Sequence, residues 1–122
     1  MAIKTIAIIE DDRDYLQVLT DILEKEGFSV FGASNGFEII NDMVENKPDL
    51  IITDLKLPEL DGDKVMAAFQ DRDVIKGVPI LVISSKDEED IKTAAKKIDA
   101  VAYLKKPVDN NKLIELVHKY TA

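Results

Sequence analysis

Apolar residues cluster in short continuous runs along the chain, and polar, turn-forming residues separate these runs. The clearest runs cover residues 6–9, 50–52 and 80–83, where every side chain is aliphatic. Continuous runs of this length are typical of strands in a parallel sheet that is covered on both faces, whereas half-exposed strands alternate. Weaker runs complete the pattern. The sequence thus predicts strands at residues 3–9, 28–32, 50–53, 80–83 and 100–104.

The segments between these strands show the spacing of amphipathic helices. In residues 12–26, Leu16, Leu19 and Leu23 recur at intervals of three and four, and Gly27 is expected to end this helix. The same spacing predicts four more helices. Their inward residues are Phe37, Ile40, Met43 and Val44 in the second, which Asn35 caps; Val65, Met66 and Phe69 in the third; Ile91, Ala94, Ala95 and Ile98 in the fourth; and Leu113, Ile114, Val117 and Tyr120 in the last, which starts at Asp109 or Asn110.

Strict alternation of strand and helix predicts an α/β fold in which helices cover both faces of a five-stranded parallel sheet. Right-handed crossovers place the carboxyl ends of all the strands along one edge, where such sheets bind ligands. The side chains that could bind a ligand or take part in a reaction fall at or just beyond these ends. They are Glu10, Asp11, Asp54, Ser84 and the pair Lys105 and Lys106. We therefore expect a functional site at this edge.

Length and composition limit the class of protein. A chain of 122 residues with 46% hydrophobic residues is expected to form a single domain over residues 1–122. No apolar run reaches the roughly 18 residues of a membrane span, and the first residues lack the layout of a secretory signal. Cysteine is absent, which excludes disulfides and thiolate metal sites. These features predict a cytoplasmic protein without membrane association.

The chain carries 24 acidic and 16 basic residues, for a net charge of −8. This charge repels nucleic acid, whose binding depends on Lys and Arg neutralising phosphates, so we expect no direct nucleic acid binding. Most of the acidity is explained by solubility alone. The local cluster at Glu10, Asp11 and Asp12 needs another explanation, because converging carboxylates repel one another unless a cation lies between them.

Four motifs carry a family resemblance that spans essentially the whole chain. They are Ile-Ile-Glu-Asp-Asp at 8–12, Asp-Leu-Lys-Leu-Pro-Glu-Leu-Asp-Gly at 54–62, Ile-Ser-Ser at 83–85, and Tyr-Leu-Lys-Lys-Pro at 103–107. In order and spacing they resemble the pattern of response regulator receiver domains of two-component signalling, of the chemotaxis-regulator type. The resemblance implies a doubly wound, flavodoxin-like (βα)5 fold with strand order 2-1-3-4-5.

The resemblance also implies a Mg²⁺ site, and hard carboxylate oxygens suit that ion. Asp11, Asp54 and the backbone carbonyl of Lys56 would bind it directly and Glu10 through water, while Asp12 caps the first helix. Asp54 would accept a phosphoryl group as a mixed anhydride.

Lys106 would contact the phosphoryl oxygens. It is preferred over Lys105, a solvated lysine in this interpretation, because Pro107 follows it, as in the Lys-Pro pair of receivers that a cis bond usually joins. Ser84 would supply a hydroxyl to the phosphoryl group.

Tyr103 stands at the aromatic switch position of the family. With Ser84 it is expected to reshape the face formed by the fourth helix, fifth strand and fifth helix, where a downstream protein docks. Two departures from the family pattern are Ser85 after Ser84, where Thr followed by Ala is common, and Asp99, where Gly commonly precedes the fifth strand. The second departure leaves the geometry of that turn open.

The expected function is acceptance of a phosphoryl group from a histidine kinase or a histidine phosphotransfer protein. The chain would catalyse its own phosphorylation and dephosphorylate slowly, since Lys56 and Lys86 flank the site, and it would not be an enzyme with a diffusible substrate. One alternative is an aspartyl-phosphate-type phosphatase, although Lys56 stands where such enzymes have a second acid. Another is a non-signalling doubly wound binding domain, although no glycine-rich loop follows the first strand. The lone His118 is expected to face solvent.

Overall fold

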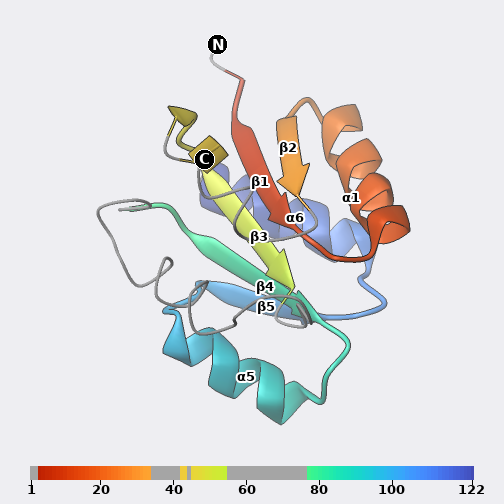
Figure 1. The fold of residues 1–122 in the computed structure, drawn as a ribbon, viewed down its shortest axis with the longest axis vertical. Coiled ribbons are helices and arrows are strands. Elements are labelled where there is room, and N and C mark those ends of the chain that lie inside the picture. The colour runs from red at the N-terminus through yellow and green to blue at the C-terminus, as the bar shows by residue number, and fades with distance from the viewer. Residues whose placement is uncertain (1–2, 34–41, 44, 55–76) are drawn as a thin grey trace.

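The computed structural model describes residues 3–33, 42–43, 45–54 and 77–122. Five parallel strands form one sheet in the order β2-β1-β3-β4-β5 (Figure 1). Their bounds are Thr5–Ile9 for β1, Ser29–Ala33 for β2, Leu50–Asp54 for β3, Ile80–Ser84 for β4 and Ala102–Lys105 for β5. The described helices are α1 at Arg13–Lys25, α5 at Glu88–Lys97 and α6 at Asn110–Thr121. The predicted parallel sheet and its strand order are confirmed.

The register of the strands aligns their carboxyl ends. Ile9 is paired with Thr53, and Asp54 is paired with Ile83 of β4. Ser84 is in turn paired with Lys105 of β5. The residues that end β1, β3, β4 and β5 therefore share one edge of the sheet.

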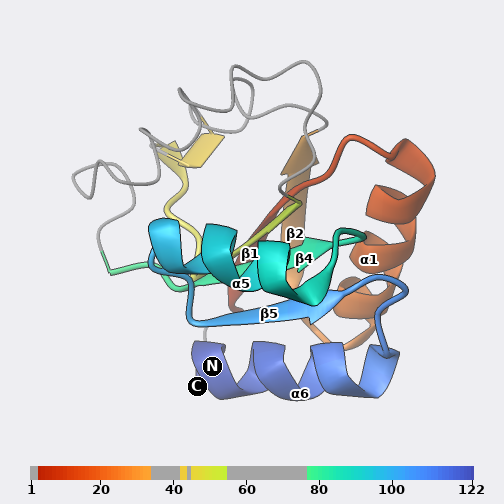
Figure 2. The same cartoon turned by 90° about the horizontal axis from the view of Figure 1, so that it is seen from below.

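The core has two layers, one on each face of the sheet. On one face, α1 and α6 pack through Leu19, Leu23, Leu113 and Val117 against the even-numbered residues of β1 and β3. On the other face, α5 packs through Ile91, Ala95 and Ile98 against side chains that include Ala7, Ile51 and Val82. Figure 2 shows α5 and α6 on opposite sides of the sheet, with β5 between them.

The ends of the helices follow their sequence signals. Asp12 caps α1, and its side chain accepts hydrogen bonds from the backbone N–H groups of Asp14 and Tyr15. Asp109 caps α6 in the same way. Gly27 follows α1 with a φ of 95° and, as predicted, ends it. Left-handed backbone at this position is accessible to glycine because it has no Cβ.

The starts of the first and the last strand along the chain differ from the prediction by two residues each. The first strand starts at Thr5 and not at residue 3. Ile3 is apolar but 69% exposed, so its side chain does not pack in the core of the sheet. The last strand starts at Ala102 and not at residue 100, because the turn after α5 extends through Ala100. The N–H of Ala100 still donates to the carbonyl of Ala95 in the helix.

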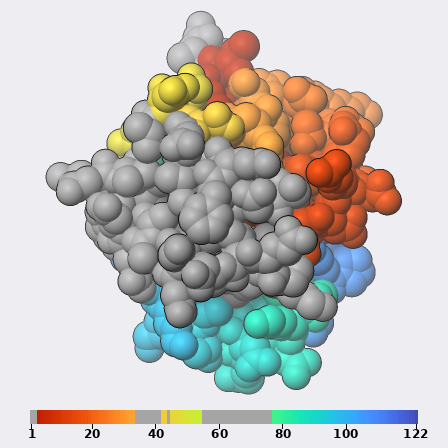
Figure 3. Space-filling model, in the orientation of Figure 1, coloured from red at the N-terminus to blue at the C-terminus, as the bar shows by residue number. Residues whose placement is uncertain are grey.

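Most of the predicted second and third helices lies outside the described residues, as does the stretch from Leu55 to Gly62. Asp42 and Met43 are described and helical, and Met43 is buried as expected for an inward position. Among the described residues, no helix is long and apolar enough to cross a membrane. Figure 3 shows α1 (orange-red) and α5 (teal) as separate parts of the surface in the orientation of Figure 1.

Candidate phosphoacceptor and metal site

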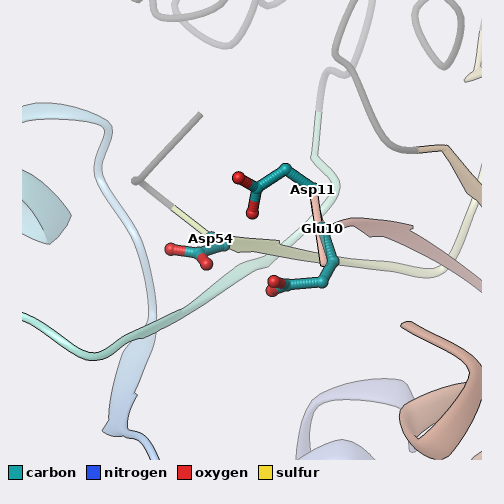
Figure 4. Close-up of side chains that lie close together, drawn as sticks. All are labelled: Glu10, Asp11 and Asp54. Carbon is teal, nitrogen blue, oxygen red and sulfur yellow. The ribbon is translucent and has the colours of Figure 1, made fainter. Parts of the chain in front are cut away.

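Three carboxylates meet at the carboxyl edge of the sheet. Glu10 and Asp11 directly follow β1, and Asp54 is the last residue of β3, the neighbouring strand. One oxygen from each of the three carboxylates lies within 4.8 Å of the other two (Figure 4). Glu10 is fully buried, Asp54 is 3% exposed and Asp11 is exposed. The edge predicted from the strand pattern thus gathers the three acids in one place.

Lys106 brings an ammonium group to this cluster from the end of β5. Its Nζ lies 2.7 Å from Oδ2 of Asp54 and 2.9 Å from both carboxylate oxygens of Glu10. The N–H of Lys106 donates to the carbonyl of Ser84, which positions the residue beside the end of β4. The Lys106–Pro107 bond is cis, as expected for the family. The ammonium thereby offsets the charge of two nearly buried carboxylates.

Burial and hydrogen bonding shift the pKa values of Glu10 and Lys106. Desolvation raises the pKa of Glu10 to about 7, with a further contribution from the charge of Asp54, although the hydrogen bond from Lys106 acts in the opposite direction. For Lys106 desolvation lowers the pKa, but the hydrogen bonds to Asp54 and Glu10 outweigh it, so its pKa is raised. The lysine is therefore charged at neutral pH, and burial disfavours the charged form of Glu10, so a further cation beside this carboxylate would be favourable.

The donor set fits a hard divalent cation. Two oxygens bound to one Mg²⁺ at about 2.1 Å lie at most about 4.2 Å apart. Carboxylate oxygens within 4.8 Å of one another reach that spacing with small side-chain rotations or through an intervening water. Receiver domains bind Mg²⁺ through such an acidic cluster, and this chain has the grouping. The backbone carbonyl of Lys56, expected as a further ligand, lies outside the described residues.

Ser84 ends β4 and is fully buried next to the acidic edge. Its Oγ accepts a hydrogen bond of 3.2 Å from the backbone N–H of Lys86, and Ser85 beside it is exposed. The neighbouring lysine of the pair, Lys105, points elsewhere. Its Nζ donates to the carbonyl of Lys86 at 3.1 Å, so it tethers the segment after β4, and Lys106 is the lysine that contacts the carboxylates.

Tyr103 lies on β5, the strand expected to carry it. Its hydroxyl donates a hydrogen bond of 3.1 Å to Oε1 of Glu88 in the first turn of α5. Partial burial and this carboxylate raise the pKa of the Tyr103 phenol above its usual value. The ring packs partly against the core layer beneath α5. Tyr103 thus connects β5 to the start of that helix.

Two contacts of the site were not expected from the sequence. The ring of Tyr15 lies under the Lys106 ammonium, with its centroid 4.6 Å from Nζ. In the sequence Tyr15 is one of several apolar residues of α1. The signal for its location is its position in the first turn of that helix, three residues after Asp12. Glu88, the acceptor of Tyr103, is likewise one acid among three in the first turn of α5. The side chain of His118 is 54% exposed, which confirms the predicted solvent-facing position. Its Nε2 lies 3.7 Å from Oε2 of Glu26.

Comparison with known proteins gives one consistent answer. Residues 6–118 match the model of the response regulator receiver domain family. The chain is 30% identical to the protein PilH of Pseudomonas aeruginosa, over 96% of this chain and 97% of the relative. It is 29% identical to the polar-differentiation response regulator DivK of Brucella anthropi, with 96% and 95% covered. It is 26% identical to the sporulation initiation phosphotransferase F of Bacillus subtilis, with 94% and 91% covered.

Solved structures agree on the fold. The structure of a response regulator from Thermotoga maritima aligns with a TM-score of 0.83 at 25% identity, over 98% of each chain. That of the chemotaxis protein CheY4 of Vibrio cholerae aligns with a TM-score of 0.87 at 23% identity, over 98% of this chain and 99% of the other. With the strand order, the acidic edge and the family match taken together, the chain belongs to the response regulator receiver domain family, the signalling domains of two-component systems.

Proposed function

We propose that Asp54 accepts a phosphoryl group from a histidine kinase or a histidine phosphotransfer protein, in a reaction that depends on Mg²⁺. The observation that carries the proposal is the contact of 2.7 Å between the Lys106 ammonium and Asp54, beside three carboxylates whose oxygens lie within 4.8 Å. Because the ammonium already contacts one oxygen of Asp54, it is within reach of the oxygens of a phosphoryl group bonded to that carboxylate. A phosphate-binding loop would not require a lysine held between two carboxylates, and neither would a catalytic dyad.

The residues divide the chemistry among them. An Asp54 oxygen attacks the phosphorus of the donor phosphohistidine, the new P–O bond forms as the P–N bond breaks, and the departing imidazole takes up a proton. Lys106 neutralises charge on the phosphoryl oxygens, and the Ser84 hydroxyl donates a hydrogen bond to one of them. Asp11 and Asp54 would hold Mg²⁺ directly, together with the expected backbone carbonyl of Lys56, and Glu10 would act through water. The bound ion supplies further positive charge where negative charge develops.

Phosphorylation then changes the face formed by α5, β5 and α6, the fourth and fifth helices of the family fold with the strand between them. We expect Ser84 to move toward the phosphoryl group, which weakens the hydrogen bond that its Oγ accepts from the N–H of Lys86. Tyr103 leaves Glu88 and turns inward, which changes the surface that a downstream protein contacts. We propose that residues 1–122 form one receiver domain that works in the cytoplasm without binding membranes or nucleic acid. It dephosphorylates itself slowly and turns over no diffusible substrate.

Mass spectrometry of the intact protein tests the acceptor. Incubation with Mg²⁺ and phosphoramidate is expected to add the mass of one phosphoryl group, which hydroxylamine removes, as it does from an acyl phosphate. Asp54→Asn should abolish the gain. Asp12→Asn serves as a matched control, because it removes one neighbouring carboxylate while an amide still caps α1. A gain that persists in Asp54→Asn, or one that resists hydroxylamine, contradicts the assignment. Steady release of phosphate from an added phosphomonoester would instead support a phosphatase.

A further inference from the structure

An aromatic side chain, that of Tyr15, lies beside the acidic cluster. Tyr15 is in the first turn of α1, where its backbone N–H donates to Oδ1 of Asp12, the residue that caps the helix. Its side chain is partly buried and packs against the core layer that α1 shares with α6. The centroid of its ring lies 4.6 Å from Nζ of Lys106. The ring therefore forms one wall of the space that the ammonium occupies.

Contacts on two sides hold this ring in place. The helix cap fixes its backbone, and Val108, two residues after Lys106, packs against the same core layer. Burial raises the pKa of the Tyr15 phenol, while a hydrogen bond from the backbone of Val108 and the charge of Lys106 act in the opposite direction. Because the net direction is upward, the ring is neutral near pH 7. Tyr15 thus joins the start of α1 to the segment that follows Lys106.

The ring differs from the carboxylates in how the proposed reaction affects its contact with the ammonium. The contacts of Lys106 with Glu10 and Asp54 depend on negative charge. The same carboxylates would also serve Mg²⁺, and phosphorylation converts that of Asp54 into an acyl phosphate. A cation over an aromatic face is attracted by the ring quadrupole and needs no net charge on the ring. The contact with Tyr15 is therefore independent of these changes.

We propose that Tyr15 positions Lys106 for phosphoryl transfer, because its ring holds the ammonium beside the acceptor while Glu10 and Asp54 give up their contacts with it. The proposal rests on the proposed function, in which Lys106 neutralises charge on the phosphoryl oxygens, and it adds the residue that keeps the ammonium within reach. Tyr15 acts through the lysine and contacts no reacting atom. It is a positioning residue and not a catalytic one.

A purely structural role for the ring is the alternative. Apolar side chains recur at helical spacing in α1, and Tyr15 packs as one of them. Its place relative to the charges favours the positioning role, since the distance of 4.6 Å to the ammonium is well within the limit of about 6 Å for a cation–π contact. Its phenol also lies close enough to Glu10 and Asp54 to be affected by their charges. A leucine would fill the same core position but would offer no aromatic face.

The rate of phosphorylation of substituted proteins tests the role. It is followed by intact mass with phosphoramidate at a saturating concentration of Mg²⁺, after circular dichroism has confirmed that each variant is folded. Tyr15→Leu keeps an apolar side chain but removes the aromatic face, and we expect it to react about fivefold more slowly than the parent. Tyr15→Phe keeps the ring, so it should restore the rate to within about twofold of the parent.

Tyr120→Leu is the matched control. The Tyr120 ring also lies under a lysine, with its centroid 5.3 Å from Nζ of Lys119, and it packs against the same core layer as Tyr15. It is near the end of α6 and contacts neither the acids nor Lys106. The variant removes an equivalent ring and should react within about twofold of the parent.

Two further measurements show whether Tyr15 acts through Lys106. In a Lys106→Met background, Tyr15→Leu should change the rate by less than about twofold, because the cation that the ring holds is gone. In the unphosphorylated protein without Mg²⁺, the ring current of Tyr15 should shift the NMR signals of the ε-methylene protons of Lys106 upfield. Tyr15→Phe should keep this shift and Tyr15→Leu should remove it.

The outcomes separate the alternatives. A parent-like rate in Tyr15→Leu, an equal loss in Tyr15→Phe, or an equal loss in Tyr120→Leu would each overturn the positioning role. So would a full effect of Tyr15→Leu in the Lys106→Met background, or lysine signals that Tyr15→Leu leaves unchanged. Absence of a phosphoryl gain in the parent rejects the proposed function itself. A gain in the parent that is indifferent to Tyr15 rejects only the positioning role.

Discussion

The ammonium of Lys106 contacts two carboxylates that are almost completely removed from water, Glu10 and Asp54. Removing one member of such a group is costly, because the buried charges that remain lose their compensation, and breaking a buried pair costs roughly 3–5 kcal/mol. At Lys106 the cost is reduced because its side chain is 18% exposed and Glu10, with its raised pKa, can take up a proton.

We therefore predict that Lys106→Met lowers the free energy of unfolding of the Mg²⁺-free protein by about 2 kcal/mol. Mg²⁺ should recover a larger part of the stability in this variant than in the parent, because the ion then takes over the role of the ammonium between the acids. Urea denaturation in EDTA and in Mg²⁺ measures both effects. Lys105→Met is the matched control, since that lysine donates to a backbone carbonyl and contacts neither carboxylate. Equal stability of the two variants in EDTA would contradict the role given to Lys106.

At the scale of the element, the end of α5 shows how the chain accommodates a departure from its family. Asp99 has a φ of 59°. Among the described residues it is the only one other than glycine with a positive φ. The N–H of Asp99 donates to the carbonyl of Lys96, and that of Ala100 donates to the carbonyl of Ala95. This is the Schellman pattern, in which the residue after the cap is left-handed and glycine is favoured. The turn that the sequence left open thus has the left-handed geometry that glycine favours, with Asp99 in that position.

We predict that Asp99→Gly is more stable than Asp99→Ala by about 1 kcal/mol. Both variants remove the carboxylate and whatever it contacts, so the difference between them isolates the cost of placing a Cβ in left-handed backbone. Gly27→Ala, at the corresponding position after α1, should lose a similar amount relative to the parent. Thermal or urea unfolding followed by circular dichroism measures all three, and Asp99→Ala as stable as Asp99→Gly would show that the turn differs from the one described.

At the scale of the whole molecule, the site joins segments that are distant along the chain. Glu10 and Asp11 follow β1, Asp54 ends β3, and the ammonium of Lys106 follows β5, so a cation that binds there links the ends of three strands. The unfolded chain does not bring these groups together. A ligand that binds only the folded state stabilises it according to its concentration relative to its dissociation constant.

Mg²⁺ should therefore raise the free energy of unfolding by about 1.4 kcal/mol at a concentration ten times its dissociation constant. Asp11→Ala should abolish most of this gain. The same variant should be at least as stable as the parent in EDTA, because Asp11 is exposed and its removal relieves repulsion within the cluster. Denaturation in Mg²⁺ or in a matched concentration of K⁺ separates the specific effect from general screening. An undiminished gain in Asp11→Ala would place the ion elsewhere.

The sequence by itself determined the alternation of strands and helices, the buried strands and the edge at which the acids lie. It could do so because hydrophobic periodicity is a local property, and because the handedness of strand connections then restricts the topology. The helix cap at Asp12, the start of the last helix at Asp109 or Asn110 and the end of α1 at Gly27 were predictable for the same reason: each depends on side chains and backbone within one turn.

Only the tertiary structure decided which side chains meet. Lys106 lies 96 residues from Glu10 and 52 from Asp54 in the sequence, so their contacts depend on the register of three strands and on no local pattern. The same holds for the ring of Tyr15 under the ammonium. Local patterns decide what each segment becomes, whereas packing between distant segments decides which charges share a site and therefore what that site can bind.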